Sequence, residues 1–442
     1  MHYGLLSFSL VILLTLSANT CCKQSAENAV EDVQPIEISV PSNTSAESSI
    51  AWNAQNMHNA LNECEFSLRC LRNLYGRENG SSFVFSPLSL QYALSMVQNG
   101  ASGETASEIT KALGYEDGES LSLFMSSLMS QLPAVDRTVD LRLVNAMMVN
   151  RSFRVKEDFR YLLETSYFAP VEYLDASQKA AVVGRLNEWA SLNTNGFIKQ
   201  IVSEDDVPQD FVAMLLNALY FKAKWFGDDY NPMFKPEATQ KSRPFFLEGK
   251  GKEIKVDYLR TSRRLKYAER DTYKAVEIPY AGNKYAMYVL LPVDNSSGAL
   301  KAVLEKLTIV EWSSLLKSLR AGPDVHLSLP KIENEIRVRL VGLLKDIGVN
   351  KAFDPGASQF DRLIDAEGHQ SYCISDVLQK ARISVTEWGT EAAAVTYVTL
   401  IGDAGPSERK KVYFEANHPF AYFIAERESG LILFEGVFTG KE

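Results

Sequence analysis

The spacing of apolar residues predicts mainly helices in the first third of the chain. From about residue 57 to 134, apolar residues recur every three to four positions, a period typical of helices that pack on a core. Ser86 followed by Pro87 predicts a helix start, because a serine caps free backbone N–H groups and a proline suits the first turn. Further helices are expected over 156–168 and 180–196.

Strand patterns dominate the later part of the chain. Residues 141–149 read as an early strand, and residues 273–292 read as a hairpin. Residues 324–349 predict a strand followed by a helix that ends at Gly348. The uninterrupted apolar run at 211–225 fits either a buried strand or a helix, since its length does not decide between them. The C-terminal strands are expected within 380–388, 410–427 and 432–440.

This order of helices followed by strands predicts an α+β fold in one large domain, residues 56–442. The chain has 442 residues, of which 46% are hydrophobic and 23% charged, so a sizeable core can form. The formal net charge is −9, and no basic stripe dominates the sequence. Nucleic acid is therefore not an expected partner.

The N-terminus differs from the rest of the chain. An apolar run at 5–16 is too short to cross a bilayer as a helix and fits the apolar core of a secretory signal. We expect a signal peptide over 1–21, and Cys21 is a candidate for lipid attachment of the bacterial lipoprotein kind. An ordinary signal cleaved after Thr20 is the alternative. Residues 22–55 predict a flexible, acidic tether. The protein is thus expected outside the cell or on its surface.

Motifs for catalysis or metal binding are absent from the sequence. Only five histidines and five cysteines occur, without HExxH, Gly-x-Ser-x-Gly, Cys-x-x-Cys or a Gly-rich phosphate loop. Cys64 and Cys70 lie six residues apart on a predicted helix, so they face different directions and are interpreted as small buried residues. No metal, cofactor or catalytic residue is predicted, and a hydrolase is disfavoured.

Several segments together resemble the serpins, a family of inhibitors of serine and sometimes cysteine proteases. The resemblance covers residues 56–442 and implies the serpin fold, with about nine helices around three β-sheets and an exposed reactive-centre loop. It also implies an inhibitor rather than an enzyme. The matching segments occur in the family's order: 83–109, 185–198, 215–225, 375–394 and 414–424.

In this family the loop, here about 387–411, is cut by a protease and then inserts into the central sheet as a strand. Serpin loop insertion is itself one of the known cases in which a segment adds a strand to a sheet. The segment fits such a strand, because its first part is uncharged on one face and contains no proline. The resemblance places the hinge at Glu387, Gly389, Thr390, Glu391, Ala392, Ala393 and Ala394.

The resemblance also implies a partner, a target endopeptidase trapped as a covalent acyl complex. Family spacing from Gly389 places the reactive bond between Asp403 and Ala404. Cleavage at 400–402 is the alternative, which would suit elastase- or subtilisin-like enzymes. The inhibitor is expected to be a monomer, with membrane anchoring through an N-terminal lipid as a further possibility.

A polar cluster beneath the opening sheet is implied by the same resemblance. Its residues here are Ser86, Ser89, Asn217, Gln379 and Trp225. Gln379 departs from the family, which usually has a histidine there, although glutamine can also donate and accept hydrogen bonds. Trp388 stands where a polar residue is usual. A non-inhibitory serpin acting as a carrier is the second functional hypothesis, but charged or proline residues at 390–396, which would favour it, are few.

Overall fold

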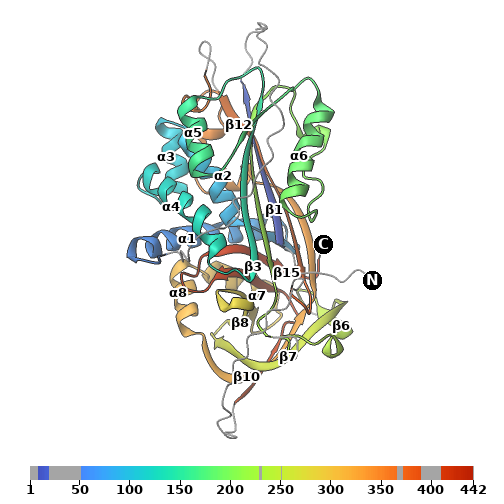
Figure 1. The fold of residues 1–442 in the computed structure, drawn as a ribbon. Helices are drawn as coiled ribbons and strands as arrows, with labels where there is room; N and C mark the ends of the chain where they lie inside the picture. The colour runs from blue at the N-terminus through green and yellow to red at the C-terminus, as the bar shows by residue number, and fades with distance from the viewer. Residues whose placement is uncertain are drawn as a thin grey trace.

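The structure is a computed structural model that describes residues 8–18, 51–227, 231–249, 251–365, 372–389 and 410–441. Within these residues, α-helices flank two β-sheets that form an elongated molecule (Figure 1). The helices are α1 (Ala54–Arg77), α2 (Pro87–Gly100), α3 (Gly103–Ala112), α4 (Gly118–Gln131), α5 (Glu157–Ser166), α6 (Lys179–Asn193), α7 (Ala299–Lys306), α8 (Ile309–Ser318) and α9 (Val341–Asp346).

The strands belong mostly to the second half of the described chain, as the sequence predicts. They are β1 (Phe8–Ala18), β2 (Phe83–Phe85), β3 (Val139–Asn150), β4 (Val171–Leu174), β5 (Phe211–Ala223), β6 (Gln240–Phe246), β7 (Glu253–Glu269), β8 (Tyr273–Pro279), β9 (Tyr285–Pro292), β10 (Arg320–Pro330), β11 (Ile332–Arg339), β12 (Tyr372–Val385), β13 (Lys411–Glu415), β14 (Phe420–Glu426) and β15 (Ile432–Phe438). The α+β prediction is confirmed.

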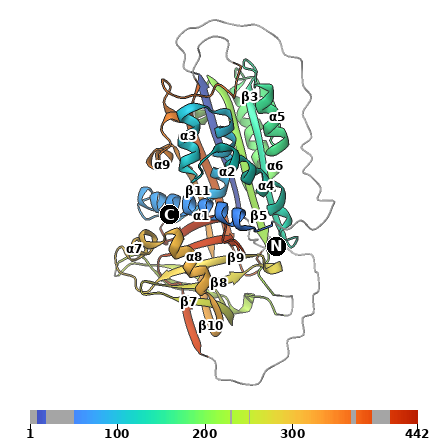
Figure 2. The same cartoon turned by 90° about the vertical axis from the view of Figure 1, so that its left-hand side faces the viewer.

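A six-stranded sheet forms the upper half of the molecule, with the strand order β11-β12-β1-β5-β3-β4. Helix α6 covers one face, and helices α2 to α5 lie on the other (Figures 1 and 2). The apolar run 211–225, which fitted a strand or a helix, is β5, and nearly all of its side chains are buried. Burial on both faces of a central strand explains why this run shows no alternation.

An N-terminal strand lies in the middle of this sheet. β1 pairs antiparallel with β12 on one side and with β5 on the other. Residues 12–16 of β1 are buried, with Ile12, Leu14 and Leu16 completely inaccessible to solvent. Residues 8–16 of the apolar run that predicts a signal peptide therefore belong to a strand in the middle of the sheet. The signal peptide itself stays a prediction.

A nine-stranded sheet forms the lower half. Eight strands follow the order β13-β10-β7-β8-β9-β14-β15-β2, and β6 also pairs with β7. The resemblance implied three sheets, but β7 is 17 residues long and pairs with β10, β6 and β8, which joins the expected second and third sheets. The expected hairpin over 273–292 is formed by β8 and β9.

Residues 332–339 form a strand where the sequence predicts part of a helix. The sequence predicts a strand and a helix over 324–349, whereas the structure has two strands, β10 and β11, before the short helix α9. β11 alternates buried or half-buried with exposed residues, because one of its faces packs on the protein and the other meets solvent. The expected helix is thus limited to Val341–Asp346.

The local signals for α2 are confirmed. The Ser86 hydroxyl accepts a hydrogen bond from the Ser89 backbone N–H, and Pro87 occupies the first helical turn. Cys64 and Cys70 are buried and free, as interpreted, and so is Cys373. In the described part of the chain, none of the helices has the length and apolar character needed to cross a membrane.

Candidate functional site

The candidate site is the slot between β5 and β12, together with the turn that follows β12. β5 uses its other edge to pair with β3, and β12 uses its other edge to pair with β11. Each strand therefore offers one remaining row of backbone N–H and C=O groups toward the slot. β1 takes up both rows, from Phe8 opposite Ile383 to Ala18 opposite Tyr372. The slot thus has the length and the backbone hydrogen-bonding groups needed to pair with one antiparallel strand.

Four of the predicted cluster residues meet beneath this slot. Gln379 of β12 accepts a hydrogen bond from the Ser86 backbone N–H (3.3 Å) and donates one to the Ser86 carbonyl (3.1 Å). The Ser89 hydroxyl donates to the Asn217 side chain of β5. All four are fully buried, and Ile12 of β1 lies directly opposite both Gln379 and Asn217.

The Asn217 side chain extends this network away from the slot. Its amide donates to the Asn145 side chain (2.6 Å), which in turn donates to the Tyr167 carbonyl (2.9 Å). Helix α2 and strands β3, β5 and β12 are therefore linked by buried hydrogen bonds. Any movement that separates β5 from β12 must preserve or exchange these bonds, since a buried polar group without a partner is costly.

Trp225 lies apart from these four residues, just after the C-terminal end of β5. Its indole N–H donates to the Thr386 carbonyl over 2.9 Å, and its ring stacks on Tyr280 with centroids 4.6 Å apart. The structure thus places Trp225 at the start of the predicted hinge rather than beneath the sheet. It joins the end of β5 to the turn after β12.

The hinge glycine is held against the end of β5. Gly389 has a φ of +67°, which favours glycine. A Cβ atom at this position would lie 2.4 Å from the Lys224 Cα and 2.5 Å from the Trp225 nitrogen. Both the conformation and the close backbone approach therefore require glycine at 389.

Glu387 is anchored just before that glycine. Its carboxylate accepts a hydrogen bond from the Thr239 hydroxyl (2.6 Å) and pairs with the Lys331 ammonium (2.7 Å). Burial by itself would raise the pKa of Glu387, but the bonds from Lys331 and Thr239 outweigh it and lower the pKa below its ordinary value. The hinge therefore begins at a fixed, ionised carboxylate.

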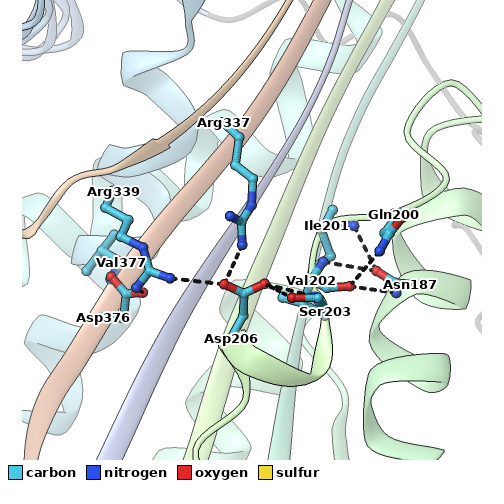
Figure 3. Close-up of polar contacts among 10 residues, drawn as sticks. All are labelled: Asn187, Gln200, Ile201, Val202, Ser203, Asp206, Arg337, Arg339, Asp376 and Val377. Carbon is cyan, nitrogen blue, oxygen red and sulfur yellow. Dashed lines mark hydrogen bonds and ion pairs between the residues drawn. The ribbon is translucent and has the colours of Figure 1, made fainter. Parts of the chain in front are cut away.

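A connection that we call the strap, residues 194–210 between α6 and β5, covers the slot on the α6 side. Ile198, Ile201, Val202 and Val207 of the strap share an apolar cluster with Leu13 of β1 and Leu378 of β12. Asn187 of α6 fixes the strap, because its side chain accepts from the Ile201 N–H (2.7 Å) and donates to the Val202 carbonyl (3.0 Å; Figure 3).

The strap is tied by charge to the far side of the slot. Asp206 accepts hydrogen bonds from the backbone N–H and hydroxyl of Ser203, both at 2.8 Å. It also pairs with Arg337 (2.5 Å) and Arg339 (3.0 Å) of β11, and Arg339 in turn pairs with Asp376 of β12 (Figure 3).

Burial by itself would raise the pKa of Asp206. The hydrogen bonds from Ser203 and Arg337 outweigh that effect and lower the pKa below its ordinary value. Asp206 is thus a charged anchor that links the strap to β11, across β1 and β12. Sequence reasoning missed this anchor, because its residues lie more than 100 positions apart and form no motif.

The remaining predicted site residues lie outside the described part of the chain. These are Thr390, Glu391, Ala392, Ala393, Ala394, Asp403, Ala404 and Cys21. Across the described ranges, no three or more His, Cys, Asp or Glu side chains are grouped so that they could hold a metal ion.

Comparison with known proteins identifies the family. A family model described as serpin (serine protease inhibitor) matches residues 61–440. An uncharacterized serpin-like protein of Thermococcus kodakarensis is 33% identical over 381 residues, 86% of this chain and 84% of that protein. Antitrypsin of Bombyx mori is 30% identical over 375 residues, 84% of this chain and 92% of that protein.

The solved structures agree with this assignment. The native state of Tengpin, a thermophilic serpin, matches with a TM-score of 0.74 at 26% identity, covering 89% of this chain and 96% of that chain. The chain therefore belongs to the serpin family and has the serpin fold.

Proposed function

We propose that the protein is an irreversible, suicide-substrate inhibitor of serine endopeptidases. A protease attacks a peptide bond in the segment after Gly389 and forms an acyl-enzyme with it. The cut segment then enters the slot between β5 and β12 as a strand before the ester is hydrolysed, and it carries the attached enzyme along the sheet. The protein acts as a substrate that is not released, rather than as a catalyst.

The slot is the observation that carries this proposal. β12 leads directly into the hinge, and Gly389 is packed against the end of β5, so a strand that starts there is already aligned with both edges. The slot accepts an uncharged strand of 11 residues, as β1 demonstrates in the complete chain. Residues 390–401 are similar in character, with one charged residue, Glu391, and no proline.

The experiment uses the chain that begins at Cys21, the product expected after leader removal. This chain is incubated with subtilisin and pancreatic elastase, and the mixtures are run on a denaturing gel. We expect a band at the summed mass that survives SDS, because an ester traps the enzyme. Complete cleavage without an adduct would instead support the carrier hypothesis.

The released fragment identifies the reactive bond. Mass spectrometry should find its first residue between Ile401 and Ala404, with Ala404 expected from the family spacing. Trypsin-like enzymes should cut after Arg409 without being trapped. The residues between Asp403 and Arg409 would lengthen the inserted segment, so that the enzyme would not be pulled against the protein and water could hydrolyse the acyl bond. A stable trypsin complex whose fragment begins at Lys410 would refute this placement.

We also propose that the protein is exported and carries a lipid on Cys21. The apolar run before this cysteine supports the proposal. Expression in an exporting bacterium, followed by mass spectrometry of the N-terminal peptide, tests it. A mature N-terminus at Cys21 with an acyl mass is the expected result, and an unmodified N-terminus at Cys21 would support ordinary secretion. Either product would lack β1.

A further inference from the structure

The slot has room for one strand, and in the complete chain that strand is β1. β12 is paired with β1 from Tyr372 to Ile383, with one register shift near Ser375, and at its hinge end β12 extends beyond β1 by Ser384 and Val385. β5 is paired with β1 from Phe211 to Phe221. With the outer edges of both strands already paired, no second row of backbone groups is available for another strand.

The side chains of residues 12–16 of β1 pack on both faces of the sheet. Ile12, Leu14 and Leu16 join the main core on the α2 side, whereas Leu13 joins the cluster beneath α6 and the strap. Thr15 is 1% exposed, and its carbonyl accepts a hydrogen bond from the Ser375 hydroxyl (3.2 Å). β1 contains no charged residue, so its insertion leaves no unpaired charge in the core.

The direction of β1 matches that of a strand entering from the hinge. β1 runs antiparallel to both neighbours. A segment that follows β12 through the turn at Trp388 and Gly389 and returns along β12 must also run antiparallel to it. Residues 8–18 and the segment after Gly389 therefore require the same backbone groups in the same direction, and they exclude one another.

From this exclusion we propose that residues 8–18 are an internal blocking strand that keeps the leader-containing chain from inserting its loop. Removal of the leader would then free the slot and convert the blocked protein into one that can insert its loop and inhibit a protease. This inference rests on the proposed function, and it adds a regulatory role for a segment otherwise expected to serve only in export.

The test uses the full chain made by cell-free translation without membranes, so that residues 1–20 stay attached. Leu14→Arg places a charge at a fully buried position of β1 and should expel the strand, and Leu14→Ile is the matched control, since isoleucine suits a strand. Two measurements are made on each protein: amide hydrogen exchange of the peptide spanning 9–17, and the rate of SDS-stable complex formation with subtilisin.

We expect the wild type and Leu14→Ile to protect this peptide and to trap subtilisin slowly. In Leu14→Arg the peptide should exchange at the rate of an unfolded chain. The rate of complex formation should rise roughly tenfold if β1 fills the slot in about 90% of wild-type molecules, because the apparent rate scales with the open fraction. Slow exchange in β14 and β15 of the variant shows that it remains folded.

The outcomes separate this inference from the proposed function. Unprotected 9–17 amides in the wild type, or equal trapping by wild type and Leu14→Arg with the strand expelled, overturn the blocking role. Protection that appears only in dimers on size-exclusion chromatography overturns the internal origin of the strand. Failure of the chain that begins at Cys21 to trap any protease overturns the proposed function, whatever the exchange data show.

Discussion

The Arg337 Nη2 atom lies 2.5 Å from the Asp206 Oδ1 atom, and this ion pair joins the strap over the slot to the edge strand β11. A strand that enters the slot must place side chains under the strap, where Leu13 now lies. The ion pair therefore holds the cover of the slot in place. It should affect both the stability of the protein and the rate of insertion.

Asp206→Asn is expected to loosen the strap while keeping the shape of the side chain. We expect a loss of about 1 kcal/mol in the free energy of unfolding, a small value because Arg337 and Arg339 are partly solvated. Complex formation with a protease should become faster. Urea unfolding and complex-formation kinetics measure the two effects. Asp205→Asn, an exposed neighbour, is the control and should change neither.

The contribution of Asp206 should depend on pH in a defined direction. Its folded-state pKa is lowered, so its charge stabilises the folded state above the ordinary aspartate pKa of about 3.9, and this stabilisation is lost as the pH falls from there through the lower folded value. The stability difference between wild type and Asp206→Asn should thus be full at pH 6 and shrink below pH 4. A difference that does not change with pH would contradict the charged anchor.

The pair of Glu387 and Lys331 should show energetic coupling at the hinge. We expect Glu387→Ala and Lys331→Ala each to lower stability, and the double variant to lose less than their sum by about 1 kcal/mol. A double-mutant cycle from urea unfolding measures this coupling. The pair of Arg382 and Glu333, in which Glu333 is 73% exposed, is the control and should couple weakly. Additive losses at 387 and 331 would argue against the anchor.

Gly389→Ala should disrupt the hinge. The new Cβ would overlap the backbone at Lys224 and Trp225, and the positive φ adds a cost of about 1–2 kcal/mol for a residue other than glycine. We therefore expect a loss of at least that size in thermal or urea unfolding. Gly184→Ala on α6 is the control, because nothing lies within 4 Å of its Cβ position and alanine favours a helix by roughly 0.5–1 kcal/mol.

Thr390→Arg should convert the inhibitor into a substrate. Thr390 would be the first loop residue to enter the sheet, and burying an unpaired charge there would cost about 3–5 kcal/mol and slow insertion. The loop should still be cut, but little adduct should remain on the gel. Thr390→Ser is the matched control. An undiminished adduct yield in Thr390→Arg would count against insertion as the trapping step.

The sequence predicted the fold class, the start of α2 and about half of the strands, because periodic patterns and caps are local signals. It did not predict β4, β6 and β7 or the helices α7 and α8. The ambiguity at β5 and the error at β11 both arise because the surroundings of a strand hide its alternating pattern in the sequence. β5 is apolar throughout since both of its faces are covered, so its pattern could not distinguish it from a buried helix. The alternation of β11 was obscured by the helical pattern of α9 directly after it.

The site could be predicted only in part. The hinge and the polar cluster have residues that resemble those of a family. The structure joins Ser86 to Gln379 and Ser89 to Asn217 by hydrogen bonds, and their role in sheet opening stays a prediction. Asp206 and its arginines carry no local signal, since their contact depends on how the strap returns to β5. The pairing of residues 8–18 with β5 and β12 joins positions more than 190 residues apart and could not be read from the apolar run.

The order of the nine-stranded sheet has a consequence for how the protein is made. β2, formed by Phe83–Phe85, pairs with β15, which ends at Phe438, and β14 lies between β9 and β15. β2 can therefore join this sheet only after β15 has been made, more than 300 residues later in the chain. Such long-range pairing makes folding slow, so a growing chain that lacks β14 and β15 leaves β2 and one edge of β9 without their partner strands. A nascent chain stalled before Ile432 should accordingly be digested by added protease at many sites, whereas the released chain should be cut only in the segment after Gly389.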